Sequence, residues 1–144
     1  MIASDKITYL DNNATTSIDP AGIFDTSDVT ITDVNGDGKP DIVTCNRISS
    51  YIFILLNQTA PGATSFTFAS RLGYTTPMDT TDVAAGDVNG DGRPDVVVTN
   101  DSQNSVAVLL NLTPPGGTPL FGPPASFAAA SPTSVSLRDF NGDG

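Results

Sequence analysis

The chain has 144 residues, a length that suits one ordinary domain. All 16 acidic residues are Asp and only six residues are Lys or Arg, so the net charge of −10 disfavours nucleic acid and anionic lipid as partners and favours cations. The 13 glycines and 11 prolines indicate many turns, which argues against a helical bundle or a coiled coil. Because the chain contains no His, a Ser-His nucleophile, a His general base and an imidazole metal site are excluded.

The apolar segments and the single cysteine set further limits. No apolar run approaches the length that spans a bilayer, so we expect no membrane insertion. The start of the chain lacks the basic residues and apolar centre of a signal peptide. Cys45 has no second cysteine to pair with, and its place in a β-branched apolar run predicts a buried thiol without a reactive role.

Residues 1–27 do not follow the pattern of the rest of the chain. We expect a strand at residues 7–10, as the outer strand of a truncated unit that precedes the others. Residues 9–16 also resemble the opening segment of the pyridoxal-phosphate-dependent cysteine desulfurases. That chemistry needs a Schiff-base lysine in a large fold, whereas the only lysines are Lys6 and Lys39, so we assign the match to chance or to a fusion junction.

An Asp-rich segment of nine residues occurs twice and begins a third time. Its copies start at Asp33, Asp87 and Asp139, so the period is 54 and then 52 residues. Residues 33–64 aligned with residues 87–118 without a gap give 17 identities in 32 positions, which indicates a true internal repeat. We therefore divide the chain into an N-terminal segment or partial preceding blade (1–27), repeat 1 (28–81), repeat 2 (82–133) and the truncated start of repeat 3 (134–144).

Each repeat has the pattern of four short strands separated by turns. The β-branched runs follow the Asp-rich segments, and the next apolar runs have the composition of strands covered on both faces. The expected strands are 28–32, 42–45, 51–56 and 66–72 in repeat 1, 82–86, 96–99, 105–110 and 121–128 in repeat 2, and 134–138 in repeat 3. Four antiparallel strands in about fifty residues are the size of a β-propeller blade, so we predict an all-β fold with two complete blades plus partial ones.

The Asp-rich segments place oxygen-bearing side chains at positions one, three, five and nine. A hard cation such as Ca²⁺ takes about six to eight oxygen ligands, and a tight loop can add the backbone carbonyl of position seven. Glycine at position six permits the sharp turn. The candidate metal ligands are Asp33, Asn35, Asp37, the backbone oxygen of Lys39 and Asp41 in repeat 1; Asp87, Asn89, Asp91, the backbone oxygen of Arg93 and Asp95 in repeat 2; and Asp139, Asn141 and Asp143 in an incomplete third site.

Three interpretations compete for these loops. An EF-hand needs Glu at position twelve, where the two copies have Thr44 and Val98, so this motif is excluded. Asp-Gly and Asn-Gly pairs also occur in ordinary hairpin turns, in which Asp only caps local amides. Three carboxylates within nine residues repel one another unless a cation lies among them, which favours a cation site. We expect Ca²⁺ rather than Mg²⁺, because no phosphate partner is evident.

The loop pattern, followed by a β-branched run and repeated after about fifty residues, resembles the FG-GAP and VCBS repeats. The resemblance covers residues 28–144. Residues 121–124 resemble the Phe-Gly element of the family, whereas residues 67–70 of the first repeat depart from it. The resemblance implies an integrin-alpha-like, calcium-binding β-propeller of seven blades, of which this chain is an open fragment. It also implies a secreted or cell-surface protein that serves adhesion or ligand presentation.

Two functions remain open from the sequence. The first is a noncatalytic, calcium-stabilised scaffold that binds a protein or glycan ligand and packs against the remaining blades of its parent protein. The alternative is an accessory or catalytic propeller segment of an extracellular calcium-dependent lyase or hydrolase. Outside the loops, the Asp residues form no recognisable acid/base set. An acid/base pair across a cleft, with one strongly raised pKa, would favour the enzyme, and a loop-lined apolar groove without such a pair would favour the scaffold.

Overall fold

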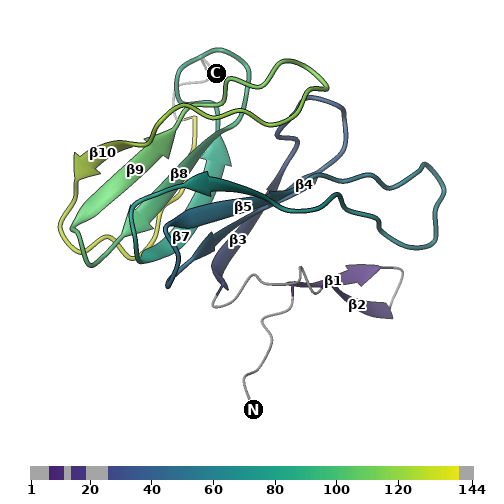
Figure 1. Cartoon of the computed structure of the whole chain (residues 1–144), viewed down its shortest axis with the longest axis horizontal. Coiled ribbons are helices and arrows are strands. Elements are labelled where there is room, and N and C mark those ends of the chain that lie inside the picture. Colours follow the sequence, from purple (N-terminus) through teal and green to yellow (C-terminus); the bar gives the residue numbers. More distant parts are fainter. Residues whose placement is uncertain (1–6, 12–13, 19–25, 140–144) are drawn as a thin grey trace.

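The computed structural model describes residues 7–11, 14–18 and 26–139 as an all-β protein (Figure 1). Its strands are β1 Ile7–Asp11, β2 Ala14–Ile18, β3 Thr26–Thr32, β4 Asp41–Asn46, β5 Tyr51–Leu55, β6 Leu72–Thr75, β7 Thr80–Gly86, β8 Asp95–Asn100, β9 Ser105–Leu109 and β10 Ala125–Ala128. The described residues form no helix, and so none that could cross a membrane. The predicted all-β class is confirmed.

Eight of the strands form two antiparallel sheets, which we call blade 1 and blade 2. Blade 1 has the strand order β3-β4-β5-β6, and blade 2 has the order β7-β8-β9-β10. In both sheets each strand pairs with its neighbour in the sequence, as in a propeller blade. The sheets lie beside each other without closing into a ring (Figure 1), which confirms the prediction of an open fragment with two complete blades.

The second strand of each blade is buried throughout. All six residues of β4 and all six of β8 are buried, as their Val, Ile and Thr content predicts. The third strands are less covered than the sequence indicated. Tyr51 in β5 is exposed, and β9 alternates between buried and half-buried positions, so one face of β9 is only partly shielded.

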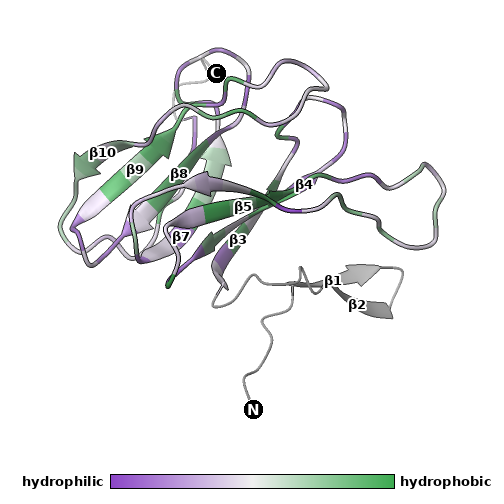
Figure 2. Ribbon diagram, viewed as in Figure 1, coloured by the Kyte–Doolittle hydropathy of each residue, from purple (hydrophilic) through white to green (hydrophobic). Residues whose placement is uncertain are grey.

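The main core lies between the two blades. It contains Val34, Val43, Cys45, Ile52 and Ile54 from blade 1 and its loop, and Val83, Val96, Val98, Ala107 and Leu109 from blade 2. Figure 2 shows these apolar segments as green stretches of the central strands. A smaller cluster around Ile42 and Leu55 occupies the opposite face of blade 1. Because the core draws on both sheets, the two blades stabilise each other.

Cys45 is part of this core and is completely buried. Its Sγ lies 3.1 Å from the Ser27 hydroxyl oxygen. Burial raises the pKa of the Cys45 thiol, so the sulfur stays protonated at neutral pH. The structure therefore agrees with the predicted packing role.

The fourth strands depart in part from the prediction. In blade 1 the strand was expected at residues 66–72, but β6 begins only at Leu72, and in the expected segment Phe68 forms an isolated bridge with Asn57. Phe121 forms the equivalent bridge with Asn111 in blade 2, where β10 lies inside the expected range. The two Phe residues thus hold the same position in the fold, although their flanking sequences differ.

The ends of the described chain also depart from the prediction. The expected strand at residues 7–10 is present within β1, but β1 pairs with β2 in a two-stranded sheet and with no strand of the two blades. Residues 134–138 were expected to form a strand and are not assigned as one. They nevertheless lie along β7, because the Val135 N–H donates to Asp82 at 2.6 Å and Leu137 lies against Gly86.

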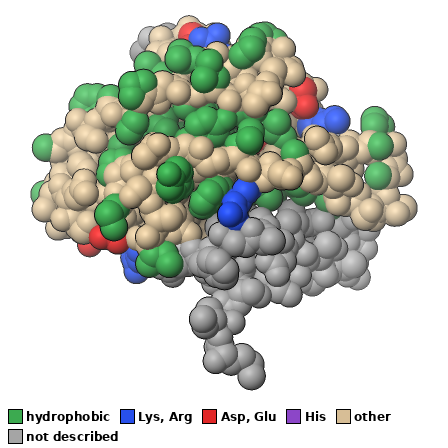
Figure 3. Space-filling view, viewed as in Figure 1, with side chains coloured by type: hydrophobic (Ala, Val, Ile, Leu, Met, Phe, Trp, Pro, Cys, Tyr) green, Lys and Arg blue, Asp and Glu red, His purple; other side chains and the backbone are tan. Residues whose placement is uncertain are grey.

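Large apolar side chains remain exposed on both outer faces of the pair of blades. Ile31 of β3 is 66% exposed, and Phe127 of β10 is 58% exposed. Their strand registers place them on the faces turned away from the shared core. Figure 3 shows apolar side chains across one side of the molecule, with only a few charged side chains among them. These faces are the ones that neighbouring blades cover in a closed propeller.

Candidate metal centre

Loop one, residues 33–41, connects β3 to β4, and loop two, residues 87–95, connects β7 to β8. Gly36 and Gly38 have φ angles of 69° and 84° in loop one, in the left-handed region. A Cβ atom at either position would meet no atom within 4 Å, so the demand for glycine is conformational rather than steric. Gly90 and Gly92 repeat these angles, and the two loops therefore share one backbone path.

The first three oxygen-bearing side chains of loop one accept hydrogen bonds from the loop's own backbone. Asp33 accepts from the N–H groups of Asp37 at 3.1 Å and Gly38 at 2.7 Å. Asn35 Oδ1 also accepts from Asp37 N–H at 3.1 Å, and Asp37 Oδ1 accepts from Lys39 N–H at 2.9 Å. This is the amide-capping arrangement of the hairpin-turn interpretation.

Asp41, at position nine, has a different environment. It is completely buried, and its two oxygens accept the N–H groups of Val34 at 3.0 Å and Asn57 at 2.8 Å. Burial raises the pKa of the Asp41 carboxyl, and these two hydrogen bonds oppose the rise. The residue therefore closes the loop and ties it to the end of β5, a structural role that the sequence pattern did not reveal.

Loop two repeats these contacts. Asp87 Oδ2 accepts the Gly92 N–H at 2.6 Å, and Asn89 Oδ1 accepts the Asp91 N–H at 2.9 Å. The hydrogen bond from Gly92 is the main cause that lowers the pKa of Asp87, so this carboxylate stays ionised. Asp95 is buried like Asp41 and accepts the N–H groups of Val88 at 3.0 Å and Asn111 at 2.7 Å.

Arg93 distinguishes loop two from loop one. Its Nη2 lies 2.6 Å from Asp91 Oδ2, and its Nε donates to the Asn111 carbonyl at 2.8 Å. The Arg93 N–H, the Asn89 amide and the guanidinium together lower the pKa of Asp91. Lys39, the counterpart in loop one, forms no ion pair with the residues that the structure describes. The sequence pattern indicates only the carbonyl of Arg93 as part of the site, and not this role of its side chain.

The carboxylates among the candidate ligands follow one another along each loop but do not form a cluster. In the described part of the chain, no three carboxylate or thiol side chains lie close enough together to hold a metal ion. The carbonyls of Lys39 and Arg93 accept no hydrogen bond from these residues. Of the predicted third site, Asp139 is described, whereas Asn141 and Asp143 lie outside the described residues.

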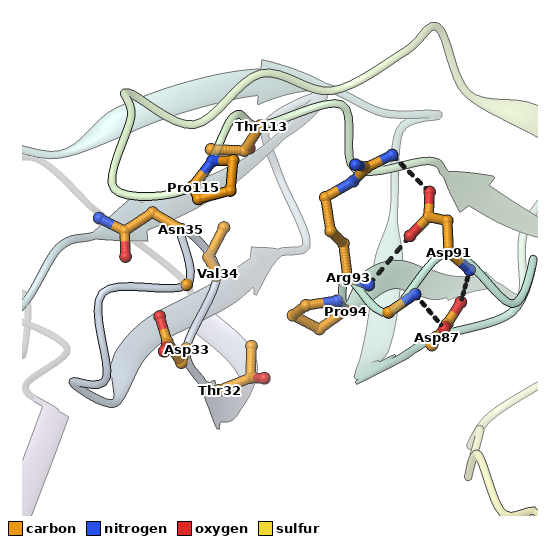
Figure 4. Close-up of a pocket in the computed structure, with 12 residues that line it drawn as sticks. Thr32, Asp33, Val34, Asn35, Asp87, Asp91, Arg93, Pro94, Thr113 and Pro115 are labelled. Carbon is orange, nitrogen blue, oxygen red and sulfur yellow. Dashed lines mark hydrogen bonds and ion pairs between the residues drawn. The ribbon is translucent and has the colours of Figure 1, made fainter. Parts of the chain in front are cut away.

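A cleft of about 640 Å³ separates the two loops (Figure 4). Loop one forms one wall, with Asp33 and Asn35, and loop two forms the other, with Asp87, Asp91 and Arg93. Thr113 and Pro115 of the segment that follows β9 also line the cleft. Both candidate loops therefore border the same hollow.

Two hydrogen bonds across the blades are not predictable from the sequence pattern. The Gly116 N–H donates to the Asn35 carbonyl at 2.6 Å, and the Asn111 side chain donates to the Val34 carbonyl at 2.9 Å. Both donors belong to the segment after β9, which lies over loop one. The only sequence signal was the identity of Leu-Leu-Asn and Pro-Gly between the repeats, which says nothing of contacts across repeats.

A second acidic pair lies on the first strands of the blades. Asp28 of β3 and Asp82 of β7 share a hydrogen bond, and Asp28 also accepts the Val83 N–H at 3.1 Å. Burial and the hydrogen bond that the protonated Asp28 donates to Asp82 raise the pKa of Asp28. Burial alone would raise the pKa of Asp82, but hydrogen bonds from Asp28, Val135 and Ser134 outweigh it and lower the pKa. Neither residue lines the cleft between the loops.

The family comparison agrees with the repeat pattern. The family model described as the FG-GAP-like repeat matches the chain twice, at residues 33–98 and at residues 87–144. Each match begins at the first Asp of a loop. Comparison with curated proteins and with solved structures gave no match.

Proposed function

The chain belongs to the FG-GAP-like repeat family, and on this basis we propose that it is a noncatalytic, calcium-binding scaffold of a β-propeller. The scaffold would present a surface to a protein or glycan ligand, at the cell surface or outside the cell, and would pack against further blades of its parent protein. The observation that carries the proposal is the donor set of the two loops, in which three carboxylates, one amide and a carbonyl follow one another within nine residues.

The donor chemistry fits Ca²⁺. Every candidate ligand offers an oxygen atom, the donor type that this cation prefers. In loop one, Asp33, Asn35, Asp37, Asp41 and the Lys39 carbonyl would hold the ion, and in loop two the corresponding residues from Asp87 to Asp95 would do so. An oxygen that accepts one backbone N–H keeps a second lone pair for a cation. Binding would draw the loop carboxylates closer together than they now lie and would relieve their mutual repulsion.

The noncatalytic assignment is supported by where the acidic residues lie. The pKa values of Asp28 and Asp82 are displaced in opposite directions, as in an acid/base pair. However, Asp28 accepts the N–H of Val83 in β7, Asp82 accepts the N–H of Val135 in the segment along β7, and neither lines the cleft. Hydrogen bonds that hold β3 of blade 1 against β7 of blade 2 explain the displaced pKa values of Asp28 and Asp82. We therefore favour the scaffold over the lyase or hydrolase alternative.

Isothermal titration of the chelator-treated protein with Ca²⁺ tests the cation sites. We expect two binding equivalents and a calcium-dependent rise in melting temperature, because a cation that binds only the folded loops stabilises the fold. Asp37→Ala and Asp91→Ala should each remove one equivalent, whereas Asp101→Ala, outside the loops, should keep both. A folded protein that takes up no Ca²⁺ at millimolar concentration contradicts the proposal. Titration with Mg²⁺ then shows whether the loops discriminate between the two ions.

A further inference from the structure

Asn111 joins the two loops through a single buried side chain. It follows β9, lies outside both loops and is completely buried. Its Nδ2 donates to the Val34 carbonyl in loop one at 2.9 Å and to the Pro94 carbonyl in loop two at 2.9 Å. A side-chain amide has two N–H groups, so both bonds can exist at once. One amide group thus fixes the position of one loop relative to the other.

The main chain of Asn111 is held by loop two as well. Its N–H donates to Asp95 at 2.7 Å, and its carbonyl accepts Arg93 Nε, whose guanidinium pairs with Asp91. Asn111 is therefore bound directly to positions seven, eight and nine of loop two, which are Arg93, Pro94 and Asp95. It is linked to position five, Asp91, through the side chain of Arg93. A shift of these positions on cation binding would move the Asn111 amide.

The loop-one side of the contact is equally constrained. Val34 is 1% exposed, and its N–H donates to Asp41 at position nine. The neighbouring carbonyl of Asn35 accepts the N–H of Gly116, from the same segment as Asn111. The carbonyl that Asn111 binds is thus rigidly connected to a candidate ligand of loop one.

Asn57 holds the same position in blade 1 but, among the described residues, donates to no other loop. Its N–H donates to Asp41 and its Nδ2 to Pro40, both within its own repeat, and its Oδ1 accepts the Thr59 N–H. Asn111 makes the equivalent three contacts, to Asp95, Pro94 and Thr113, and adds the bond to Val34. The two residues are a matched pair that differs in the contact across the blades.

We propose that Asn111 is a positioning residue that couples the two loops, so that a cation bound in loop one increases the affinity of loop two. This inference rests on the proposed calcium binding. Ordering of loop one fixes the Val34 carbonyl and with it the Asn111 amide, so loop two loses less freedom when its own cation binds. Linkage requires that a cation in loop two increases the affinity of loop one by the same factor.

The test measures the affinity of loop two with loop one intact and disabled. Calcium titrations followed by NMR at the Gly92 amide report on loop two, and Asp37→Asn disables loop one. We expect the affinity of loop two to fall about five-fold or more when loop one is disabled, the lower end of usual coupling factors. Physiological salt limits the direct electrostatic effect of the lost charge.

The double mutants isolate the role of Asn111. Asn111→Asp keeps the shape and the backbone contacts but removes both N–H donors. In this background the Asp37→Asn effect on loop two should disappear, whereas in the Asn57→Ala background it should persist. If Asn111 served only the stability of the fold, Asn111→Asp would lower the calcium affinity of loop two by the same factor with loop one intact and with loop one disabled. The ratio of these two affinities would then be the same as in the wild-type protein.

Each outcome has one meaning. If neither loop of the folded protein binds Ca²⁺, the proposed function fails. If both loops bind and disabling loop one leaves the affinity of loop two unchanged, only the coupling fails. The assignment to Asn111 fails if the coupling survives in Asn111→Asp. Asn111→Ala, which also lacks both N–H donors and matches Asn57→Ala, provides the comparison if the Asp variant does not fold, and coupling of unchanged strength in that variant also overturns the assignment.

Discussion

Loop one and loop two share eight of nine residues and differ only at Lys39 and Arg93, yet their surroundings are unlike. Val34 is 1% exposed and belongs to the core, whereas Val88 at the same position is 44% exposed. The cause is the segment after β9, which covers loop one through the bonds of Gly116 and Asn111. The environment of loop one is therefore set by the repeat that follows it, and not by its own sequence.

The largest expected effect comes from position nine, where Asp41 and Asp95 are buried alike in the two loops. Asp41→Ala leaves the buried N–H groups of Val34 and Asn57 without an acceptor, and Asp95→Ala does so for the buried N–H of Asn111 and the part-buried N–H of Val88. Each should lower the free energy of unfolding by about 2 to 5 kcal/mol, measured by urea denaturation in the presence of a chelator.

Asp101→Ala is the control for this pair and should change stability by less than about 0.5 kcal/mol, because Asp101 is exposed in a turn. Asp79 is unsuitable as a control, since its φ of 60° disfavours Ala. A loss confined to one of the two loops would contradict the equivalence of Asp41 and Asp95.

The next largest effect is a loss of stability that should differ between the two loops. Val34→Ala removes two buried carbon groups from the core and should cost about 2 kcal/mol of stability. Val88→Ala removes the same groups from an exposed side chain and should cost about 0.5 kcal/mol or less. Thermal or urea unfolding of the two variants measures the difference directly. Equal losses would show that the segment after β9 does not protect loop one in solution.

A pH series tests the contact between repeats at the first strands. The raised pKa of Asp28 means that the folded state binds its proton more tightly than the unfolded state, so its contribution to stability grows as pH falls from 7 through that pKa. The lowered pKa of Asp82 acts in the opposite sense, and its contribution is lost as pH falls through the usual Asp range.

The difference in unfolding free energy between the wild-type protein and Asp28→Asn reports this pair. The variant carries a permanently uncharged group, so its advantage over the wild type should be largest at pH 7 and should shrink toward pH 4. Ser134 replaces the Asp in the third repeat, so Asp82 has no acidic neighbour on that side. A pH-independent difference would rule out a shared proton.

The smallest effect concerns the single difference between the loop sequences. Arg93→Ala removes a surface ion pair and the hydrogen bond from Nε to the Asn111 carbonyl, so it should lower the melting temperature slightly, whereas Lys39→Ala should have almost no effect. Arg93→Ala also frees the Asp91 carboxylate from its guanidinium partner and should therefore increase the calcium affinity of loop two. Calorimetric titration of both variants checks this, and an unchanged affinity would mean that the ion pair does not compete with the cation.

The sequence predicted strands best where composition and position agree. The runs at 42–45 and 96–99 lie inside β4 and β8, because β-branched residues suit a strand that is covered on both sides. The prediction of 66–72 failed because Gly, Ser and Thr around it favour turns, and the pairing with β5 resumes only at Leu72. Local propensity could not locate that point, since the partner strand determines it.

By itself the sequence determined the repeat, the all-β class, the two loops and their oxygen donors. These follow from identities at a fixed spacing and from the residue types that turns and strands require. The tertiary structure alone decided that Asp41 and Asp95 are buried, that Val34 is covered while Val88 is not, and that Asn111 reaches across to loop one. The physical reason is that burial and hydrogen bonding depend on which segments pack together, and Asn111 and Val34, which meet here, lie 77 residues apart in the chain.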